Sequence, residues 1–564
     1  MLKLLTACLL SLSVGILSAE AAPVDNNSPS LIEIGRRIYQ DGVVESGEEL
    51  RGVSAAKVTF SGKQAACMRC HRKSGFGTSE GTNIIAPITG EFLFPTIRAE
   101  LSPDVEISKK VQRQQRALSW LGDPPVTYSQ SMFSRALSEG INSAGQSMDL
   151  LMPRYALSDK EVAGLTAYLK SLSAYSEPSV DQTTIHFATV IMPGAKPSQS
   201  QAMLDVLKAF EADMSSDTRS IKRRRKVATH AMYRSYRDWK LHVWTLTGPD
   251  ESWGEQLEQL YRQQPVFAVL SGIGGDNWRP MHEFCERQEI PCLFPNSDLP
   301  IIDDGYYSFY FSRGMALEAE VLAKQFKSSV QNDVIVQVFS KDENRGVEAA
   351  RILRDSMKKA GRAKNLLDWT IPDGQNEKLW QQMLAEQKPN AVVLWVNGKD
   401  LAKVGDWDEK EFSQQQIFLS ASMLGSELGS DPDLLPKSLH KFKENIRLIY
   451  PFKIPEKSAR YLLRTKLWLR SKKIALTDER VQANTYFAAN MAGDVLSHMF
   501  SHYSREYFIE LVEHMIGRSL VTSVYPQLNL GPGQRFASKG AYLLKYSNRQ
   551  GKVLEPITGW VVPY

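Results

Sequence analysis

The clearest chemical motif of the sequence is one short segment, Cys67-Met68-Arg69-Cys70-His71. Two thiols three residues apart, followed directly by an imidazole, could serve a zinc site, a redox dithiol or the covalent attachment of haem. A zinc site needs four ligands, and no second Cys or His pair of suitable spacing follows. A thioredoxin-like dithiol follows a strand, whereas the surroundings here are helical and glycine-rich. The segment therefore favours one covalent haem, with Cys67 and Cys70 as thioether donors and His71 as an axial iron ligand.

The opposite face of such an iron requires a ligand from elsewhere in the N-terminal part, where His71 is the only histidine before residue 177. The remaining candidates are the methionines of this region, Met68, Met132, Met148 and Met152. Met68 lies inside the attachment segment, and Met132 occupies an apolar position of an expected helix. Met152 precedes Pro153 in a loop whose backbone the proline restricts. We predict Met152 as the second ligand and Met148 as the runner-up; if both only pack, the iron is five-coordinate or held by histidine alone.

The N-terminus has the features of an export signal. One lysine, an apolar run and the small-residue pattern Ala19-Glu20-Ala21 predict a signal peptide over residues 1–21 that is cleaved after Ala21. The apolar run is short for a membrane span, and no later segment is apolar enough for one. We therefore expect a periplasmic mature protein without a membrane span. Its four cysteines, Cys67, Cys70, Cys285 and Cys292, would meet an oxidising compartment.

Composition narrows the function classes. The 564 residues are too many for one core, and 43% hydrophobic and 23% charged residues are typical of globular domains. A net charge of +5 and the lack of a basic stripe interleaved with aromatic residues give no argument for nucleic-acid binding. The sequence contains no nucleophile elbow, no triad motif and no phosphate-binding loop. We therefore expect an electron carrier or binding protein rather than an enzyme.

The chain divides at a polar linker over residues 173–183. Before it, helices are expected over residues 30–44, 131–141 and 158–173, the last opened by a capping box formed by Ser158 and Glu161. After it, apolar strand-like runs alternate with helical stretches, which indicates parallel sheets covered by helices. The expected strands lie at 186–193, 265–273, 333–340, 390–398, 416–424 and 446–452, and the expected helices at 252–264, 277–288, 315–329 and 377–387.

The first part, residues 30–177, resembles the class I cytochrome c domains, an all-α family. The resemblance rests on "GRRIYQDG", on "CMRCH" and on "MPRYALSDKEVAGLTAYLKSL", which occur in the family's order. It implies one haem c, with His71 as proximal ligand and Met152 as distal ligand. It also implies that Gly35 and Tyr168 pack the first and last helices together.

The second part, residues 184–564, resembles the type I periplasmic binding proteins of the branched-chain amino-acid receptor branch. The resemblance rests on the order of "VFAVLSGIGG", "IPCLFPNSD", "YYSFYFSRG" and "LGPGQRFASKGAYLLKY". It implies two hinged, Rossmann-like lobes and a small ligand, such as an amino acid, an amide or a carboxylic acid, held between them by loops after strands. The matching polar positions are Ser271, Gly272, Asn296, Ser297, Asn397, Ser420 and Ser422, which could equally cap helices and fill turns.

Cys285 and Cys292 flank the end of an expected helix and the next strand. In an oxidising compartment they could form a disulfide, and the alternative is a pair of buried thiols.

Together these features predict an exported monohaem cytochrome c that carries single electrons to redox partner proteins and is fused to a small-ligand-binding module. One alternative is a receptor for transport or sensing in which the haem senses redox state or a gas. Another is a haem enzyme such as a peroxidase, which would need an open coordination position.

Overall fold

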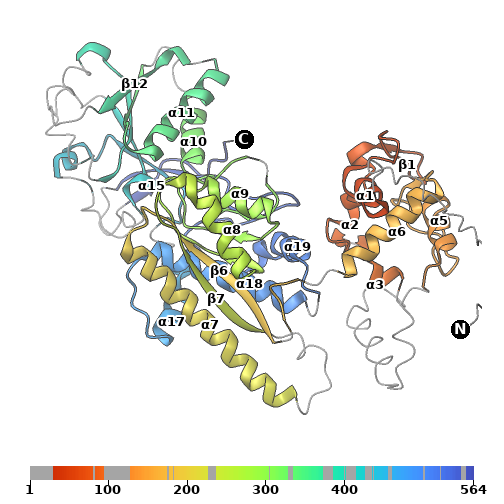
Figure 1. The fold of residues 1–564 in the computed structure, drawn as a ribbon. Helices are drawn as coiled ribbons and strands as arrows, with labels where there is room; N and C mark the ends of the chain where they lie inside the picture. Colours follow the sequence, from red (N-terminus) through yellow and green to blue (C-terminus); the bar gives the residue numbers. More distant parts are fainter. Residues whose placement is uncertain are drawn as a thin grey trace, which may run out of the picture. The chain divides into compact units, whose positions relative to one another are not determined.

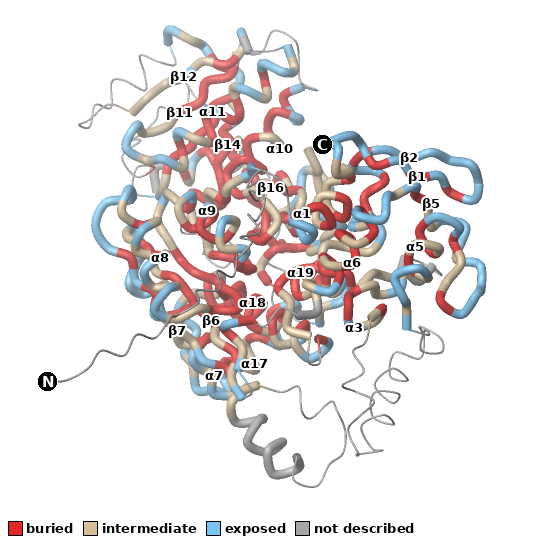
Figure 2. The backbone as a smooth tube through the Cα atoms, turned by 45° about the vertical axis from the view of Figure 1, so that its right-hand side comes forward, coloured by how far each residue is buried: buried red, intermediate tan, exposed pale blue. Residues whose placement is uncertain are grey.

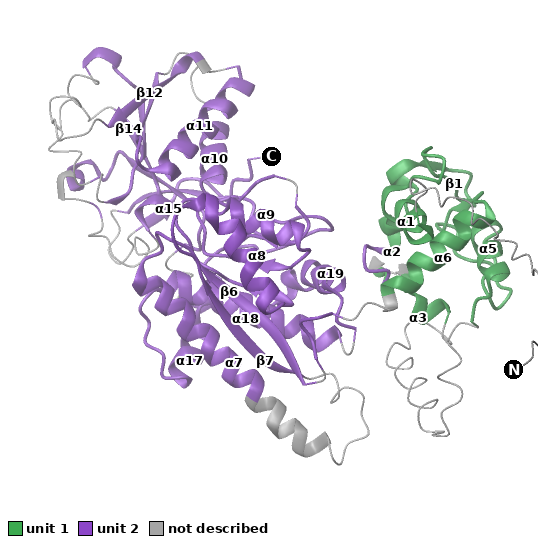
Figure 3. Ribbon diagram, viewed as in Figure 1, with its two compact units in different colours: residues 1–71, 77–98, 123–174 green, residues 72–76, 99–122, 175–564 purple. Residues whose placement is uncertain are grey.

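The computed structural model describes residues 30–563 with internal gaps at 81–82, 95–126, 175–176, 182, 226–236, 304, 328–333, 362, 372–384, 399–400, 402–414, 426–434, 436, 455–459, 500–501, 521–522 and 548–553. The predicted signal peptide (residues 1–21) and most of the predicted helix 377–387 lie outside the described residues. The chain forms two compact units (Figures 1 and 3). The first comprises residues 1–71, 77–98 and 123–174, and the second residues 72–76, 99–122 and 175–564.

The first unit is mainly helical. Its helices are α1 (Leu31–Arg36), which continues as a wider turn over Arg37–Asp41, α2 (Met68–His71), α3 (Gly90–Leu93), α5 (Gln130–Ser138) and α6 (Asp159–Ala174), with a 3₁₀ turn at Gly62–Gln64. Its strands are β1 (Arg51–Val53), β2 (Thr59–Ser61), β3 (Thr78–Glu80), β4 (Asn83–Ile85) and β5 (Arg154–Tyr155). The strands form an antiparallel sheet β2-β1-β5 and a β3–β4 pair, so the all-α description of this part was too simple. Each strand has at most three residues, too few for an alternating pattern to be recognised.

The sequence signals for the first and last helices of this unit are confirmed. The Ser30 hydroxyl accepts from the amide of Glu33 at 3.2 Å and caps α1. At the start of α6, the amide of Ser158 donates to the Glu161 carboxylate at 2.8 Å and the amide of Glu161 donates to the Ser158 hydroxyl at 3.3 Å, the reciprocal pair of a capping box.

The close packing of α1 on α6 depends on Gly35. A Cβ atom at Gly35 would collide with the carbonyl group of Gly164 and with the Cβ of Tyr168, so only glycine allows this approach of the two helices. Beside this contact, the Gln40 side chain donates to the Tyr168 hydroxyl at 2.7 Å. The pairing of Gly35 with Tyr168 is therefore as expected from the sequence.

The second unit contains two sheets, which we call the first and second lobes (Figure 1). The first lobe has the parallel order β10-β9-β8-β6-β7. Its strands are β6 (Thr184–Ile191), β7 (Asp238–Thr245), β8 (Ala268–Leu270), β9 (Cys292–Leu293) and β10 (Ser308–Phe309), with helices α7 (Pro197–Arg225), α8 (Trp253–Gln263) and α9 (Arg279–Arg287). The predicted strands and helices of this lobe are found, and β7 is an edge strand that the sequence did not reveal.

The second lobe has the order β12-β11-β13-β14-β15-β16-β17, in which the first five strands are parallel and β16 and β17 return antiparallel. Its strands are β11 (Ile335–Ser340), β12 (Leu366–Ile371), β13 (Ala391–Trp395), β14 (Gln416–Ser420), β15 (Ile446–Tyr450), β16 (Tyr542–Tyr546) and β17 (Leu554–Pro556). Its helices are α10 (Met315–Lys327), α11 (Asn344–Lys359) and α15 (Ala421–Leu424). The parallel strands are apolar runs because both faces of the sheet are covered. All five residues of β13 are buried, and the strands β11 and β14 on either side of it are mostly buried as well (Figure 2).

Between β15 and β16 the described part of the chain includes the helices α17 (Leu463–Ser471), α18 (Glu479–Met499) and α19 (Arg505–Met515), and a 3₁₀ turn at Ile516–Arg518. Helix α18 packs against α7 of the first lobe, so the chain crosses from one lobe to the other after β15 and returns before β16. Its buried face includes Phe487 and Met491, which belong to the same apolar cluster as strand residues of both sheets. This shared core unites the two lobes in one unit.

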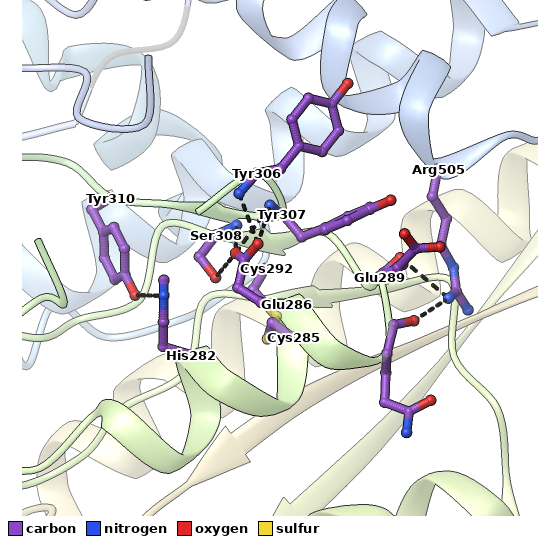
Figure 4. The surroundings of a disulfide bond; sticks show 11 residues. His282, Cys285, Glu286, Glu289, Cys292, Tyr306, Tyr307, Ser308, Tyr310 and Arg505 are labelled. Atoms are coloured by element: carbon purple, nitrogen blue, oxygen red, sulfur yellow. Dashed lines mark hydrogen bonds between the residues drawn. A yellow bond between two sulfur atoms is a disulfide. The ribbon is translucent and has the colours of Figure 1, made fainter. Parts of the chain in front are cut away.

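Cys285 and Cys292 are joined by a disulfide with Cα atoms 6.3 Å apart (Figure 4). The bond ties the last turn of α9 to the start of β9, at a place where other interactions fix the same turn. The Glu286 carboxylate accepts from the backbone amides of Tyr306, Tyr307 and Ser308. The region around the disulfide is therefore held by both covalent and hydrogen bonds.

Among the described residues, no helix combines the length and the apolar character needed to cross a membrane.

Candidate functional site

The residues of the attachment segment lie on one short helical turn of the first unit. Cys67 directly precedes α2, and Cys70 and His71 end it. Because Cys67 and Cys70 are three residues apart on a helical turn, their side chains project from the same side of it. Burial raises the pKa of the Cys67 thiol to about 12.

The imidazole of His71 is held in one orientation. Its Nδ1 lies 3.0 Å from the carbonyl oxygen of Ala86, and because a carbonyl only accepts, Nδ1 carries the proton and Nε2 keeps its lone pair. Burial lowers the pKa of His71 to about 4, so the ring is neutral at physiological pH. A neutral imidazole whose second nitrogen is anchored by a backbone carbonyl is the usual arrangement of a metal-binding histidine.

The two candidate methionines differ in their surroundings. Met152 and Cys67 both pack against the same apolar cluster, which includes Tyr155 and Leu165. Met152 also directly precedes Pro153 and β5, which pairs with β1. Met148 is half-buried and does not belong to this cluster. The two thiols and the neutral imidazole fit the donor set that a c-type haem requires, and of the two methionines Met152 is the one that packs against the cluster contacted by Cys67.

The polar residues predicted after the strands of the first lobe are engaged within the protein. The Ser271 hydroxyl is 1% exposed and lies 3.1 Å from the Thr485 hydroxyl of α18. The Asn296 amide donates to Ser271 at 3.1 Å and accepts from Asn484 of the same helix at 3.1 Å. The structure thus brings Ser271 and Asn296 together, and both attach α18 to the sheet.

The neighbouring positions also have local roles. Gly272 has φ +112°, in the region that favours glycine, and a Cβ there would press on Trp278 and Val190. The Ser297 hydroxyl accepts from the amide of Leu299 at 3.3 Å. These contacts support the turns that follow β8 and β9.

In the second lobe, Ser420 and Ser422 lie beside a buried acid. The Ser420 hydroxyl caps α15 by accepting from the amide of Met423 at 3.1 Å. Glu318 of α10 is fully buried, and neither of its oxygens has a hydrogen bond of good geometry, although both serines lie close to it. Burial raises the pKa of Glu318 to about 7, and the two serine hydroxyls lower it only in part.

We predict that Glu318→Gln removes a pH dependence of stability. The carboxyl pKa is about 7 in the folded chain against an ordinary value of 4.5, so wild-type stability falls as the pH rises between these values, by up to about 3 kcal/mol. The variant should therefore match wild type near about pH 5 and exceed it by that amount near about pH 8. Urea unfolding followed by tryptophan fluorescence measures this in the second unit, since the eight tryptophans among the described residues all belong to it. The exposed Glu348→Gln is the control; a constant difference between Glu318→Gln and wild type at both pH values would contradict the prediction.

The sequence missed a group of charged side chains at the strand ends, which we call the ionic cluster. It consists of Asp276, Asp298, Glu343, Arg345 and Arg480. Arg345, in the first turn of α11 in the second lobe, reaches Asp276 at 3.6 Å and Asp298 at 3.4 Å, and both acids follow strands of the first lobe. The two lobes therefore meet through this arginine.

Arg480 of α18 holds the other oxygen of Asp298, and its guanidinium also donates to the Tyr525 hydroxyl at 3.1 Å. Burial acts to raise the pKa of Asp298, but the two arginines outweigh it and the pKa lies below its usual range. Asp276 has the opposite balance: burial and the nearby Glu343 raise its pKa. The cluster thus combines firmly ionised acids with one that protonates more readily.

Asn397, predicted from the end of β13, belongs beside this cluster, because its amide donates to Glu343 at 2.9 Å. Of the predicted strand-end residues, it is the one that lies where charged groups of both lobes converge. The rest of the cluster is drawn from positions far apart in sequence, which only the folded chain brings together.

Comparison with known proteins gives similarity to solved structures only. No protein-family model matches the chain, and no curated protein matches it. A fatty acid ABC transporter substrate-binding protein from Thermomonospora curvata is 13% identical, with 69% of this chain and 95% of that chain covered and a TM-score of 0.47. A branched-chain amino acid ABC transporter protein from Thermus thermophilus with bound valine is 12% identical, with 68% and 97% covered and a TM-score of 0.46. A solute-binding protein from R. palustris in complex with benzoate is 11% identical, with 67% and 97% covered and a TM-score of 0.47. At these values the similarities do not by themselves establish a family or a ligand.

Proposed function

We propose that this chain is an extracytoplasmic receptor for a small organic ligand and that its first unit carries one covalent c-type haem. The ligand would bind between the two lobes of the second unit, as in type I periplasmic binding proteins, and serve transport or sensing. The observation that carries the proposal is the convergence of charged side chains from both lobes at the ends of parallel strands, where open α/β sheets bind ligands. The disulfide between Cys285 and Cys292 supports an oxidising compartment.

The charges of the ionic cluster suggest the class of ligand. Arg345 can receive a carboxylate, while Asp276 and Glu343 can receive an ammonium or amide group. Both signs lie side by side, with Asn397 as a neutral hydrogen-bonding group. A zwitterion such as an amino acid, or a small amide or carboxylic acid, would replace contacts that the protein now makes with itself.

Thermal denaturation of the full chain in the presence of amino acids, short amides and small carboxylic acids tests the binding proposal. A ligand that binds only the folded state must raise the melting temperature in a concentration-dependent way. Asn397→Ala and Asp276→Asn should reduce that shift. If no compound of these classes changes the melting temperature, a small-ligand receptor of this kind is ruled out.

For the first unit, the proposal assigns Cys67 and Cys70 to covalent attachment, His71 to one axial position and Met152 to the other. When bound, a c-type haem supplies reversible single-electron transfer. The chain's own residues orient it: the Ala86 carbonyl fixes the His71 ring, and the pairing of β5 with β1 fixes the backbone next to Met152.

A pyridine haemochrome assay should find one haem per chain, and Cys67→Ala or Cys70→Ala should reduce or abolish stable attachment. Met152→Ala should remove the weak far-red band that sulfur ligation gives to oxidised haem, whereas Met148→Ala should retain it. Loss of the band in Met148→Ala alone would reverse the assignment of the methionines. Protein that contains no covalent haem after expression with the haem-attachment machinery would exclude the cytochrome proposal altogether.

The position of Met152 also favours a second function, the carriage of single electrons to redox partner proteins, because methionine ligation raises the haem potential and leaves no open coordination position. Measuring the haem midpoint potential with and without the ligand distinguishes a sensing receptor from an electron carrier. In a sensing receptor the potential shifts on binding, and reciprocity requires the redox state to change the ligand affinity by the same free energy.

A further inference from the structure

The segments that connect the two lobes enclose a cavity distinct from the ionic cluster. It has a volume of about 340 Å³, within the range of small-molecule sites. Its walls come from the chain after β15, from α18, from the turn that follows α19, and from the segment that leads into β16. Lys453 supplies an ammonium group, and Phe487 and Tyr525 form part of a buried apolar wall.

Lys453 is an unusual residue for such a wall. It is 8% exposed, and its ammonium donates to the carbonyl of Ser523 at 2.9 Å and lies 4.7 Å from the centre of the Tyr461 ring. Within the described part of the chain, no carboxylate forms an ion pair with it. Burial lowers the pKa of Lys453 to about 8, with no acidic neighbour to restore it. A buried ammonium without a counter-charge destabilises the fold, and such groups concentrate at binding sites.

The remaining lining defines the shape of a ligand. Phe487 is 1% exposed and Tyr525 4% exposed, so this part of the wall is aromatic and buried. Tyr461 and Tyr542 provide rings nearer the solvent. One ammonium beside aromatic and aliphatic walls fits one negative charge attached to an apolar body. A dianion such as a phosphate ester would leave charge uncompensated in this environment.

We propose that this cavity binds a small monocarboxylate with an aromatic or aliphatic body, whose carboxylate pairs with Lys453 and whose body packs against Phe487 and Tyr525. The site is independent of the ligand cleft proposed above. It touches the ionic cluster through Tyr525, whose hydroxyl accepts from Arg480.

Two substitutions test the charge and the space separately. Lys453→Gln keeps a donor for the Ser523 carbonyl but removes the charge. Gly517 lines the cavity, has no positive φ, and a Cβ placed there would meet no atom within 4 Å, so Gly517→Leu should fill the cavity without strain. Lys472→Gln, which removes a lysine paired with Asp213 outside the cavity, is the matched control.

Isothermal titration of the full chain with butyrate, hexanoate, phenylacetate and 3-(4-hydroxyphenyl)propionate, and with phenylacetamide as the uncharged analogue, gives the readout. At least one acid should bind wild type with one-to-one stoichiometry and a Kd of about 1 mM or lower, and the amide should bind at least about tenfold more weakly. Lys453→Gln and Gly517→Leu should each raise the Kd of that acid at least about tenfold, while Lys472→Gln leaves it unchanged.

The proposal is overturned if none of the acids binds, or if an acid binds and both cavity variants retain wild-type affinity, which would place the acid in the cleft instead. Melting temperatures without ligand show that the variants are folded. Because Lys453→Gln removes a buried charge, its melting temperature should equal or exceed that of wild type. This result distinguishes a ligand-binding lysine from one that stabilises the fold.

Discussion

Asp298→Ala should lower the free energy of unfolding of the second unit by roughly 3–5 kcal/mol, the cost of leaving a buried charge without its partner. The carboxylate pairs with Arg480 and Arg345, whose side chains are 12% and 24% exposed. Removing it leaves the buried Arg480 guanidinium without this counter-charge, beside the Tyr525 hydroxyl and the Phe452 ring. Urea unfolding followed by tryptophan fluorescence measures the loss.

The control is Asp303→Ala, which breaks an ion pair with Arg279 in which both side chains are more than half exposed. That change should cost less than about 1 kcal/mol. The double variant Asp298→Ala/Arg480→Met should recover part of the stability, because it removes both charges. The Asp298–Arg480 pair would not be the source of the lost stability if Asp298→Ala and Asp303→Ala lowered the free energy of unfolding equally. The same conclusion would follow if the double variant were less stable than Asp298→Ala.

The pH dependence of stability provides an independent test of the role of Asp298. The pKa of Asp298 is lowered in the folded chain, so its contribution is present above the ordinary value of 3.8 and is lost as the pH falls through the folded value. The difference between wild type and Asp298→Ala should therefore shrink only under strongly acidic conditions. For Glu318, whose pKa is raised, the dependence has the opposite sign and lies nearer neutrality.

The parts of the fold that the sequence revealed are those encoded by neighbouring residues. The capping box of Ser158 and Glu161 is confirmed because its partners are three residues apart. The buried parallel strands β11, β13 and β14 were found because both faces are covered, which leaves uninterrupted apolar runs. The edge strand β7 was missed because exposed and buried residues are mixed along it.

The candidate site was harder to predict because its hydrogen-bond partners come from remote segments. Ser271 and Asn296 were predicted from strand ends alone, whereas their hydrogen-bond partners on α18 lie about 200 residues later in the chain. The ionic cluster combines residues from the ends of β8 and β9, the start of α11 and the start of α18. Residues that are so far apart in the chain form no recognisable sequence pattern. The attachment segment, in contrast, is contiguous, so Cys67 and His71 could be recognised from the sequence alone.

An ion pair near the boundary between the units joins residues that are far apart in the chain. Breaking it should produce the second of the two largest losses of stability. Glu177, within the predicted linker, is 4% exposed and accepts from Arg505 of α19 at 2.8 Å. Glu177 and Arg505 both lie within the second unit, whose ranges are residues 72–76, 99–122 and 175–564. Arg505 also donates to the carbonyls of Val266 at 2.9 Å and Gln288 at 3.0 Å, near the disulfide (Figure 4).

Arg505→Met should therefore cost roughly 3–5 kcal/mol, because it leaves the buried Glu177 carboxylate without its counter-charge and removes the donor to the backbone carbonyls of Val266, Gln288 and Glu289. Glu177→Gln should cost less, about 1–3 kcal/mol, since the amide oxygen can still accept from Arg505. Arg287→Met, which breaks a pair with Glu258 through a side chain that is 53% exposed, is the matched control and should cost about 1 kcal/mol or less. Tryptophan-monitored urea unfolding ranks the three variants. If Arg505→Met proves no more costly than Arg287→Met, then Glu177 does not belong to the second unit's core.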